Sequence, residues 1–308
     1  MAHGIADDAL TTTFAAMRKP VVIAPAMNTN MYESPATQEA IRTLSQWDNI
    51  TMLDAASGEL ACGTTGKGRM QEVDVLVAAA EYALTPKTMA GKHVVITAGP
   101  TQEAIDPVRY ISNASTGKMG YSLVRACLNR GAEVTLVSGP THLSLKAWQQ
   151  FCPLRVENVV SSAAMCEATV AAFEQADIAI LCAAVADFTP CTTADKKIKK
   201  QPGQDGMVVE LKTTTDIAAT LGASKQANQR LVGFALETHD EQANALRKLQ
   251  SKNLDMIVLN SLQDQGAGFG VDTNKVTLLF ADGTKKDLPL LLKQEVADVI
   301  VESILQLI

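Results

Sequence analysis

The sequence lacks any apolar run close to the roughly 18 residues that span a membrane. Its first residues also lack the basic stretch and apolar core of a signal peptide, so we expect a cytoplasmic protein without a membrane partner. Basic residues are scattered, and the net charge is −6. Because general nucleic-acid binding usually needs a concentrated basic face, this composition argues against a nucleic-acid partner.

Metal-binding cysteine patterns are absent too. The six cysteines form no Cys-x-x-Cys pair and have no histidine nearby at metal-ligand spacing; they are Cys62, Cys127, Cys152, Cys166, Cys182 and Cys191. We expect most of them to be buried free thiols, whereas Cys62 differs because it lies in a glycine-rich stretch. With 308 residues, 47% of them apolar and 19% charged, the chain is long enough for two globular domains.

Two common nucleotide-binding motifs are also missing. A Walker loop needs a Gly where this chain has Ser112 and a Ser or Thr where it has Met119. A dinucleotide fingerprint opens a helix after a strand, whereas the glycines of residues 266–270 precede a strand-like run at 275–280. We predict that this glycine cluster is a loop and not a cofactor-binding turn.

The most informative stretch that is present spans residues 93–120. An apolar strand at 93–97 leads into a polar loop of about 16 residues, beyond the usual 2 to 6, and then into a helix. A helix start offers unpaired N–H groups and the positive end of its dipole, and Arg109 and Lys118 add positive charge. This combination predicts a phosphate or carboxylate site. The alternative is an ordinary connection in which Ser115 or Thr116 caps the helix.

The first part of the chain predicts a strand at 20–24 and helices at 35–47 and 73–84. Residues 57–70 are rich in glycine and are expected to form a flap without regular structure. A Thr-Pro-Lys sequence then separates this part from the strand at 93, which places a boundary near Pro86. The predicted domains are residues 1–87 and 88–308.

From residue 93 onward, apolar strands alternate with helices. The predicted strands are 93–97, 133–138, 178–183, 230–236 and 256–260, and the helices are 116–130, 161–175, 216–224 and 241–252. This order predicts an α/β fold with a doubly wound, mostly parallel, Rossmann-like sheet. A last strand at 275–280 can pair antiparallel before a helix at 288–307. Because ligands bind at the carboxyl ends of such strands, we expect a cleft for a nucleotide-sized ligand there.

Seven ordered motifs in the second part carry a family resemblance. They are Ile-Thr-Ala-Gly-Pro-Thr at 96–101, Asp-Pro-Val-Arg-Tyr-Ile-Ser-Asn at 106–113, Gly-Lys-Met-Gly at 117–120, Ala-Ala-Val-Ala-Asp at 183–187, Lys-Ile-Lys-Lys at 197–200, Gly-Phe-Ala-Leu-Glu-Thr at 233–238 and Gly-Phe-Gly-Val-Asp-Thr-Asn at 268–274. Together they resemble phosphopantothenoylcysteine synthetase, and the match covers essentially everything after Lys92.

The first part resembles the decarboxylase half of the same bifunctional coenzyme A biosynthesis protein. Residues 25–31, which include Asn28, resemble its substrate-binding motif, and residues 61–70 resemble its substrate-clamping flap with the redox-active Cys62. The family's glycine-rich first strand-turn-helix and its catalytic histidine have no counterpart in the chain. The resemblance therefore implies the carboxyl-terminal part of a flavodoxin-like α/β decarboxylase domain, which would bind FMN only if it were complete.

For the second part, the resemblance implies a phosphopantothenate–cysteine ligase. In this family the carboxylate of 4'-phosphopantothenate attacks the α-phosphate of CTP to give an acyl-cytidylate, and the amine of cysteine then displaces CMP. Because one anion attacks another, Mg²⁺ and cationic side chains must neutralise charge. The residues implied are Asn113, Lys197 and Arg109 for catalysis; Ala183, Ala184, Asp187, Lys197, Phe234, Lys248 and Lys252 for CTP; and Arg109, Ser115, Gly117 and Lys118 for phosphopantothenate.

Several of these residues also have an ordinary structural interpretation. Residues 196–200 could be a solvated charged run, although the family assigns Lys197 to the reacting phosphates. The Asn113 amide is expected to donate to the carbonyl of the acyl-cytidylate, but Asn also forms Asx turns and caps. Arg109 could bind an anionic substrate group or pair with Glu103 or Asp106.

The polar segment 188–206 is too long for a turn, and the family uses this region to reach across a dimer, so we expect a homodimer. Two other classes of function remain open. One is a flavin-dependent decarboxylase, which Asn28 and Cys62 favour, and the other is a non-catalytic nucleotide-binding or regulatory module. Flavin absorbance of the purified protein distinguishes the first of these.

Overall fold

A computed structural model describes residues 1–61, 63–200, 205–237, 239–261, 266, 268 and 270–308. The chain divides into two compact units. The smaller comprises Met1–Lys87, Asn129–Gly131 and Ser144–Pro153, and the larger comprises Thr88–Leu128, Ala132–Leu143 and Leu154–Ile308. Within the described ranges, no helix is long and apolar enough to cross a membrane.

The smaller unit combines short helices with two small sheets. Its elements are α1 (Ala9–Ala16), β1 (Val21–Ile23), α2 (Thr29–Tyr32), α3 (Pro35–Ser45), β2 (Ile50–Met52), β3 (Ala56–Glu59), β4 (Thr65–Arg69), α4 (Val73–Leu84) and α6 (Lys146–Gln149). Strands β1 and β2 pair in parallel. Helix α3 starts where Ser34 accepts a hydrogen bond from the Thr37 amide and Pro35 occupies the first turn.

The expectation of an irregular flap at 57–70 is wrong, because β3 and β4 form an antiparallel hairpin there. Its glycines serve close packing: a side chain at Gly66 would collide with Thr29, and one at Gly68 would collide with the carbonyl of Met27. Glycine in a strand can mark such a close approach of another backbone segment.

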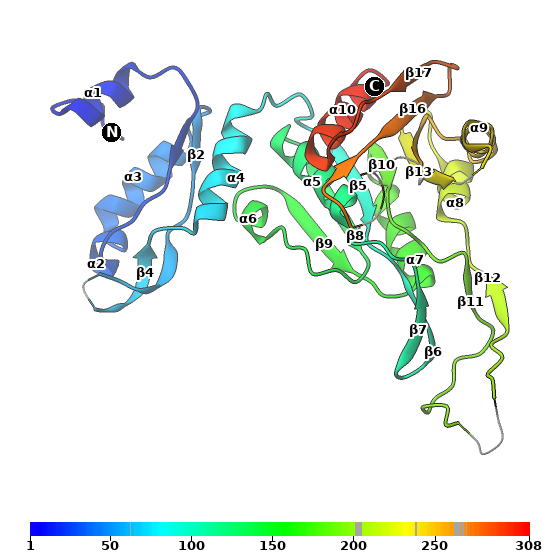
Figure 1. Ribbon diagram of the computed structural model, residues 1–308. Helices are drawn as coiled ribbons and strands as arrows, with labels where there is room; N and C mark the ends of the chain where they lie inside the picture. The colour runs from blue at the N-terminus through cyan, green and yellow to red at the C-terminus, as the bar shows by residue number, and fades with distance from the viewer. Residues whose placement is uncertain (62, 201–204, 238, 262–265, 267, 269) are drawn as a thin grey trace. The chain divides into compact units, whose positions relative to one another are not determined.

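The larger unit is built on an eight-stranded sheet, drawn with its helices in Figure 1. The strand order is β17-β16-β14-β13-β10-β5-β8-β9. The strands are β5 (His93–Ala98), β8 (Glu133–Ser138), β9 (Leu154–Asn158), β10 (Ile178–Leu181), β13 (Arg230–Glu237), β14 (Met256–Ser261), β16 (Val276–Phe280) and β17 (Lys285–Asp287). Six of them run parallel, while β16 and β17 are antiparallel. The predicted α/β fold with a mostly parallel sheet is confirmed, as is the antiparallel strand at 276–280.

Helices cover both faces of this sheet, with α5 and α10 on one side and α7, α8 and α9 on the other (Figure 1). Their bounds are α5 (Lys118–Asn129), α7 (Ser162–Phe173), α8 (Ile217–Ser224), α9 (Glu241–Ser251) and α10 (Lys293–Leu305). Val94, Val95 and Ile96 of β5 are all fully buried, because successive side chains face opposite layers. The last helix begins at residue 293 instead of 288 because β18 (Leu291–Leu292) first pairs with β15 (Thr273–Asn274).

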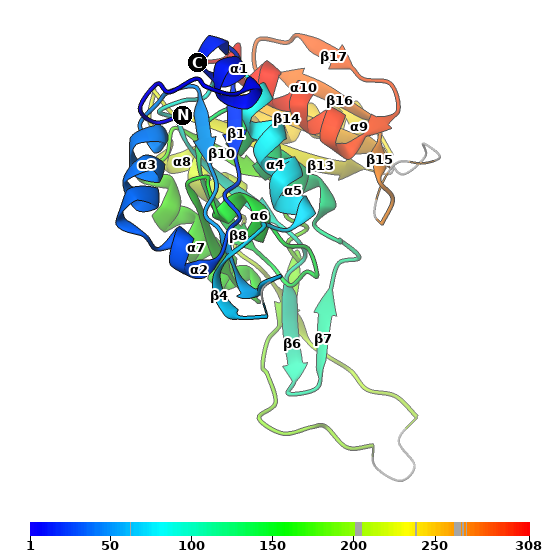
Figure 2. The same ribbon diagram turned by 90° about the vertical axis from the view of Figure 1, so that its left-hand side faces the viewer.

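The predicted loop at 98–113 contains a second hairpin, β6 (Gln102–Asp106) and β7 (Arg109–Ser112). At its tip, the Asp106 carboxylate accepts hydrogen bonds from the amides of Val108 and Arg109, which fixes the turn. Beside it run β11 (Phe188–Pro190), β12 (Leu211–Thr213) and the described chain between them. We call β6, β7 and the described residues of 188–213 (188–200 and 205–213) the arm; Figure 2 shows it extending away from the sheet.

Candidate functional site

A cleft of about 650 Å³ opens in the larger unit at the carboxyl ends of the central strands. Its wall is formed by Thr97 of β5, the start of α5, the chain after β10, the start of α8, and residues of β13, α9 and β14. The sequence-predicted residues among its lining are Asn113, Ser115, Gly117, Lys118, Ala183, Ala184, Asp187, Phe234, Lys248 and Lys252. The sheet topology brings them together because parallel strands end at the same edge.

Glycines allow the start of α5 to approach β5 closely. Gly117 has a φ of +79° and lies against the backbone of Gly99, whose own φ is +80°. One turn further, a Cβ at Gly120 would lie 2.5 Å from the Ala98 Cβ. The amino end of α5 therefore lies at the cleft, where its N–H groups and dipole favour an anion. Ser115 accepts from the Gly117 amide at 3.3 Å, before the helix begins at Lys118.

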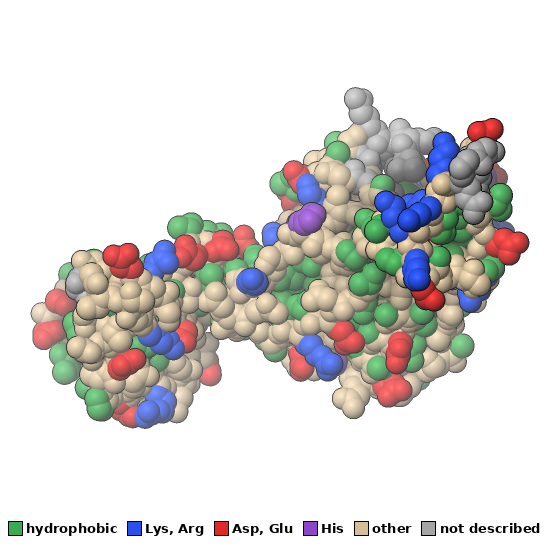
Figure 3. All heavy atoms as spheres, turned by 90° about the horizontal axis from the view of Figure 1, so that it is seen from below, with side chains coloured by type: hydrophobic (Ala, Val, Ile, Leu, Met, Phe, Trp, Pro, Cys, Tyr) green, Lys and Arg blue, Asp and Glu red, His purple; other side chains and the backbone are tan. Residues whose placement is uncertain are grey.

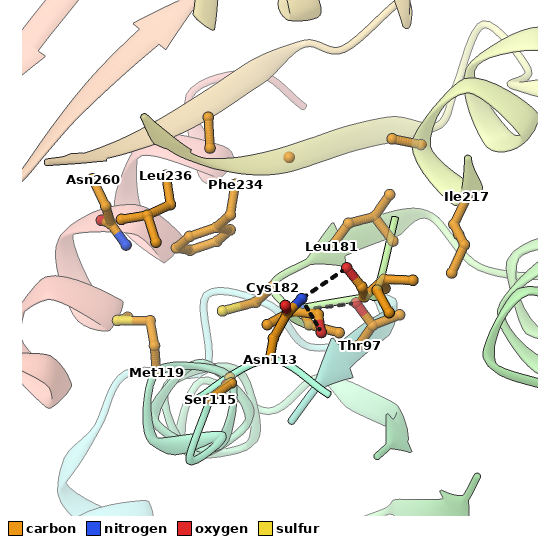
Figure 4. Close-up of a pocket in the computed structure, with 18 of the residues that line it drawn as sticks. Thr97, Asn113, Ser115, Met119, Leu181, Cys182, Ile217, Phe234, Leu236 and Asn260 are labelled. Atoms are coloured by element: carbon orange, nitrogen blue, oxygen red, sulfur yellow. Dashed lines mark hydrogen bonds between the residues drawn. The ribbon is translucent and has the colours of Figure 1, made fainter. Parts of the chain in front are cut away.

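The Asn113 side chain ties the end of the hairpin to the chain after β10. Its Nδ2 donates to the carbonyl oxygens of Ala184 at 3.2 Å and Val185 at 3.0 Å, as the dashed lines in Figure 4 show. Both partners are acceptors, so the amide nitrogen must face them. The same chain is held from β5, because Thr97 Oγ1 accepts from the Ala183 amide at 3.2 Å. The centre of the cleft is thus fixed by side-chain hydrogen bonds.

Three predicted lysines in the lining each form an ion pair. Lys118 lies 2.6 Å from Asp272, Lys248 lies 2.7 Å from Glu237, and Lys252 lies 2.7 Å from Asp216. Burial raises the pKa of Asp216, but the hydrogen bonds from Lys252 and the Ala219 amide outweigh it and hold that pKa below its usual range. Asp187 is exposed, and Phe234 is half-buried beside Leu236 and Asn260 (Figure 4).

A fourth lysine in the lining was not predicted from the sequence. Lys293 is 6% exposed, and its Nζ donates to the carbonyl oxygens of Gly268 at 3.1 Å and Val271 at 2.6 Å. Burial, followed by the nearby charge of Lys118, lowers its pKa. The sequence does contain a signal for the burial of this lysine, because Lys293 falls on the same helical face as Val296 and Ile300, which are buried.

Cys182 also lines the cleft, just beyond the end of β10. Burial raises the pKa of its thiol to about 12, although the charge of Lys293 opposes this change. The thiol is therefore protonated at neutral pH. Among the described residues, no group of three or more His, Cys, Asp or Glu side chains is placed to hold a metal ion.

Arg109 and Lys197 lie outside the lining of the cleft, on the arm. Arg109 donates to Asp106 from Nε at 3.0 Å and from Nη2 at 2.5 Å, so the structure contains the ion pair that was the alternative for this residue. The Asp106 carboxylate also accepts from the Ile198 amide at 3.1 Å, which fixes the chain next to the exposed Lys197. In Figure 3, which views the molecule from below, Lys and Arg side chains gather beside hydrophobic ones on this side.

In the smaller unit, Asn28 caps α2 by accepting from the Asn30 amide at 2.9 Å, while Cys62 lies outside the described residues. A cavity of about 310 Å³ lies elsewhere in this unit. Its lining is Met1, Leu10, Thr13, Phe14, Met17 and residues 21–24, in which the Thr13 hydroxyl is the one polar side-chain group.

Comparison with known proteins identifies the family. A family model described as the DNA/pantothenate metabolism flavoprotein C-terminal domain matches residues 89–308, and one described as Flavoprotein matches residues 1–84. The coenzyme A biosynthesis bifunctional protein CoaBC of Bacillus subtilis is 50% identical over 99% of this chain and 74% of its own length. A cysteine/cysteine sulfinic acid decarboxylase from an unknown prokaryotic organism is 50% identical over 100% of this chain and 85% of its own.

A solved structure agrees with these matches. The crystal structure of the C-terminal domain of a coenzyme A biosynthesis bifunctional protein CoaBC is 39% identical, with a TM-score of 0.59 over 72% of this chain and 97% of its own. The chain therefore belongs to the CoaBC family of coenzyme A biosynthesis enzymes, in which the domain matched by residues 89–308 is the phosphopantothenate–cysteine ligase part.

Proposed function

We propose that residues 88–308 catalyse the CTP-dependent ligation of 4'-phosphopantothenate and cysteine. The observation that carries this proposal is the cleft, in which four lysines and a helix start surround a strand-end site that also contains Asn113. The lysines are Lys118, Lys248, Lys252 and Lys293, against the two lining carboxylates of Asp187 and Asp216. Although Lys118, Lys248 and Lys252 pair with Asp272, Glu237 and Asp216, four ammonium groups and a helix start in one cleft suit a nucleoside triphosphate together with a second anionic substrate.

In the first step, the substrate carboxylate attacks the α-phosphate of CTP. The bond from the α-phosphorus to the bridging oxygen breaks, and pyrophosphate leaves. Both reactants are anions, so the positive side chains must lower the repulsion between them. In this proposal Phe234, which lines the cleft, packs against the pyrimidine, and exposed Asp187 accepts from a ribose hydroxyl. Mg²⁺ would be held mainly by the phosphates and water, which matches its ordinary behaviour in nucleotide sites.

In the second step, the amine of cysteine attacks the acyl carbon, and CMP leaves. Negative charge develops on the acyl oxygen, and a donor there stabilises it. The Asn113 amide can supply this donor by exchanging one of its two carbonyl partners, which lie at the ordinary distances of 3.0 and 3.2 Å.

The arm suggests how Lys197 reaches a reacting phosphate. Because it lies outside the cleft lining of its own chain, we propose a homodimer in which each arm contributes Lys197 to the partner's cleft. Exposed apolar residues on the arm, including Phe188, Ile198 and Leu211, would be covered by such contact.

Mixing two inactive variants tests this arrangement. Asn113→Asp and Lys197→Gln subunits, mixed in equal amounts under conditions of subunit exchange, form mixed dimers in half of the cases. One site of each mixed dimer is then intact, so roughly a quarter of the wild-type rate of amide formation should return. If Lys197 serves its own cleft, no activity returns.

The direct test of the ligase is an incubation with CTP, Mg²⁺, phosphopantothenate and cysteine that follows pyrophosphate, CMP and amide. Absence of CTP-dependent amide formation would exclude the proposed reaction. ATP in place of CTP measures the nucleotide preference, which the lining residues do not themselves determine.

A second candidate function, flavin-dependent decarboxylation, concerns residues 1–87. The Flavoprotein match and the decarboxylase relative favour it. The cavity described in this unit does not fit FMN, because its side chains offer one hydroxyl and no cationic group for the phosphate. We therefore derive no step through flavin. Flavin absorbance in the purified protein, together with release of carbon dioxide from phosphopantothenoylcysteine, would support this activity.

A further inference from the structure

The described residues 266, 268 and 270–274, called the glycine turn here, contribute to the cleft wall but have no role in the proposed reaction. Gly268 and Asn274 line the cleft, and the Asn274 amide donates to Asn260 Oδ1 at 3.2 Å. The turn leads into β15, whose partner β18 directly precedes α10. The Lys293 amide at the start of α10 donates to the Asp272 carbonyl at 2.9 Å. The turn is therefore packed against a helix start.

Two lysine side chains hold this turn from different elements. Lys293 Nζ, from α10, bonds the carbonyl oxygens of Gly268 and Val271. Lys118 Nζ, from α5, bonds the Gly270 carbonyl at 3.2 Å and the Asp272 carboxylate at 2.6 Å. Lys118 also lies at the helix start that faces the cleft. The two ammonium groups therefore fix the turn between the starts of α5 and α10.

The environment of Lys293 is unusual for a buried cation. The side chain is 6% exposed, and its hydrogen-bond partners are carbonyl oxygens, whereas Asp272 has a side chain that is 79% exposed and pairs with Lys118. Burying an ammonium group without a buried carboxylate is costly. Among the residues that the structure describes, no buried carboxylate pairs with Lys293, and an anion in the cleft that Lys293 lines would supply negative charge.

We propose that Lys293 is a positioning residue for an anionic group, phosphate or carboxylate, of a substrate. Its ammonium group donates to two turn carbonyls, which carry no net charge, and therefore keeps its positive charge beside Lys118. An ammonium group has three donors, so one remains for the ligand or a bridging water after the two carbonyls are bonded. This inference rests on the proposed ligase function, because that function supplies the anionic substrates.

Binding measurements separate this role from a merely structural one. Calorimetric titration of the full chain with CTP alone and with phosphopantothenate alone should show at least a roughly 10-fold weaker affinity for one of them in Lys293→Met. Lys293→Arg keeps the charge and the donors, and should stay within about 3-fold of wild type. Lys286→Met is the matched control, because Lys286 is exposed on β17 and should bind both ligands normally.

The alkaline pH profile gives a second readout. Among the described residues, Lys118, Cys182 and Asp272 are the charged or titratable groups around Lys293, and burial and Lys118 lower its pKa from 10.5. The ammonium form is lost as pH rises through this lowered value. The affinity for the anionic ligand should therefore fall at a lower pH than it would with an ordinary lysine. In Lys293→Arg this alkaline fall should move to higher pH. The arginine variant thus decides the case even if Lys293→Met does not fold.

The outcomes distinguish the inference from the function on which it rests. If the wild type forms no amide, the ligase proposal fails. If the wild type is active and folded Lys293→Met binds both ligands with wild-type affinity, the role of Lys293 is overturned. A change in melting temperature alone, with unchanged affinity and alkaline profile, assigns Lys293 to stability and equally overturns it.

Discussion

Helix α5 depends on glycine at residue 120 for its distance from β5, and Gly120→Ala tests this dependence. The new Cβ would lie 2.5 Å from the Ala98 Cβ and 3.2 Å from the Ala98 Cα. Because carbon atoms pack at about 3.5–4.0 Å, the helix start must move about 1 Å from the strand. Alanine favours the helix by about 1 kcal/mol, whereas overpacking costs about 1–3 kcal/mol, so we expect a net loss of stability of about 0–2 kcal/mol.

Activity should fall more than stability, because Lys118 and the helix N–H groups move with the helix start. A displacement of about 1 Å can cost on the order of 100-fold in rate, so CTP-dependent pyrophosphate release should fall about 10- to 100-fold. The assay is a coupled pyrophosphate measurement, run beside thermal unfolding that should show a decrease of a few degrees.

Two further variants sharpen this experiment. Adding Ala98→Gly to Gly120→Ala removes the nearest clashing atom and should recover part of the rate. Lys286→Met is the neutral control, because Lys286 is exposed on β17, outside the arm and the cleft lining. Wild-type activity and melting temperature in Gly120→Ala would refute the view that this close approach sets the site.

Three other predictions concern the reaction and the arm. Asn113→Asp should still release pyrophosphate but yield little amide; loss of both products would place Asn113 in the first step instead. Lys197→Gln should abolish pyrophosphate release, and near-normal release would remove Lys197 from the reacting phosphates. Burial raises the pKa of Asp106, but the hydrogen bonds from Arg109, Val108 and Ile198 outweigh it and lower that pKa from 3.8 to about 2. The contribution of the Asp106 carboxylate to the stability of the arm is therefore complete above pH 3.8 and lost as pH falls through about 2. Hydrogen exchange at the Ile198 amide should lose its protection between about pH 4 and about pH 2. Constant protection contradicts this assignment.

The central sheet could be predicted from sequence because strands buried on both faces are apolar at nearly every position. Residues 133–138 form β8 with the bounds that the pattern gives. The β6–β7 hairpin was not predicted, because its strands are short and largely polar and carry no regular apolar alternation. The glycines of β4 led to the wrong prediction for a different reason. They allow contact with Met27 and Thr29, and this tertiary requirement gives the strand a composition that is typical of loops.

The part of the candidate site that follows the ends of parallel strands was predictable, because those ends meet at one edge of the sheet. Asn113, Lys118 and Phe234 line one cleft although Phe234 lies far from the other two in the sequence. Arg109 lies apart because the hairpin carries it away from the sheet, and no local pattern reveals that direction. The burial of Lys293 was not predictable, because a lysine at a helix start is usually solvated. Its burial depends on how β15 and β18 place α10.

The thiol of Cys182 has a consequence for the redox chemistry of the cleft. With a pKa of about 12, about one thiol in 10⁵ is ionised at pH 7. Because only the thiolate attacks disulfides, Cys182 is protected from forming a mixed disulfide with cystine, the oxidised form of the proposed amino-acid substrate. Among the described cysteines, oxidants and alkylating reagents should instead reach the exposed Cys191 first, so this enzyme can handle a reactive thiol without Cys182 in its cleft being covalently blocked.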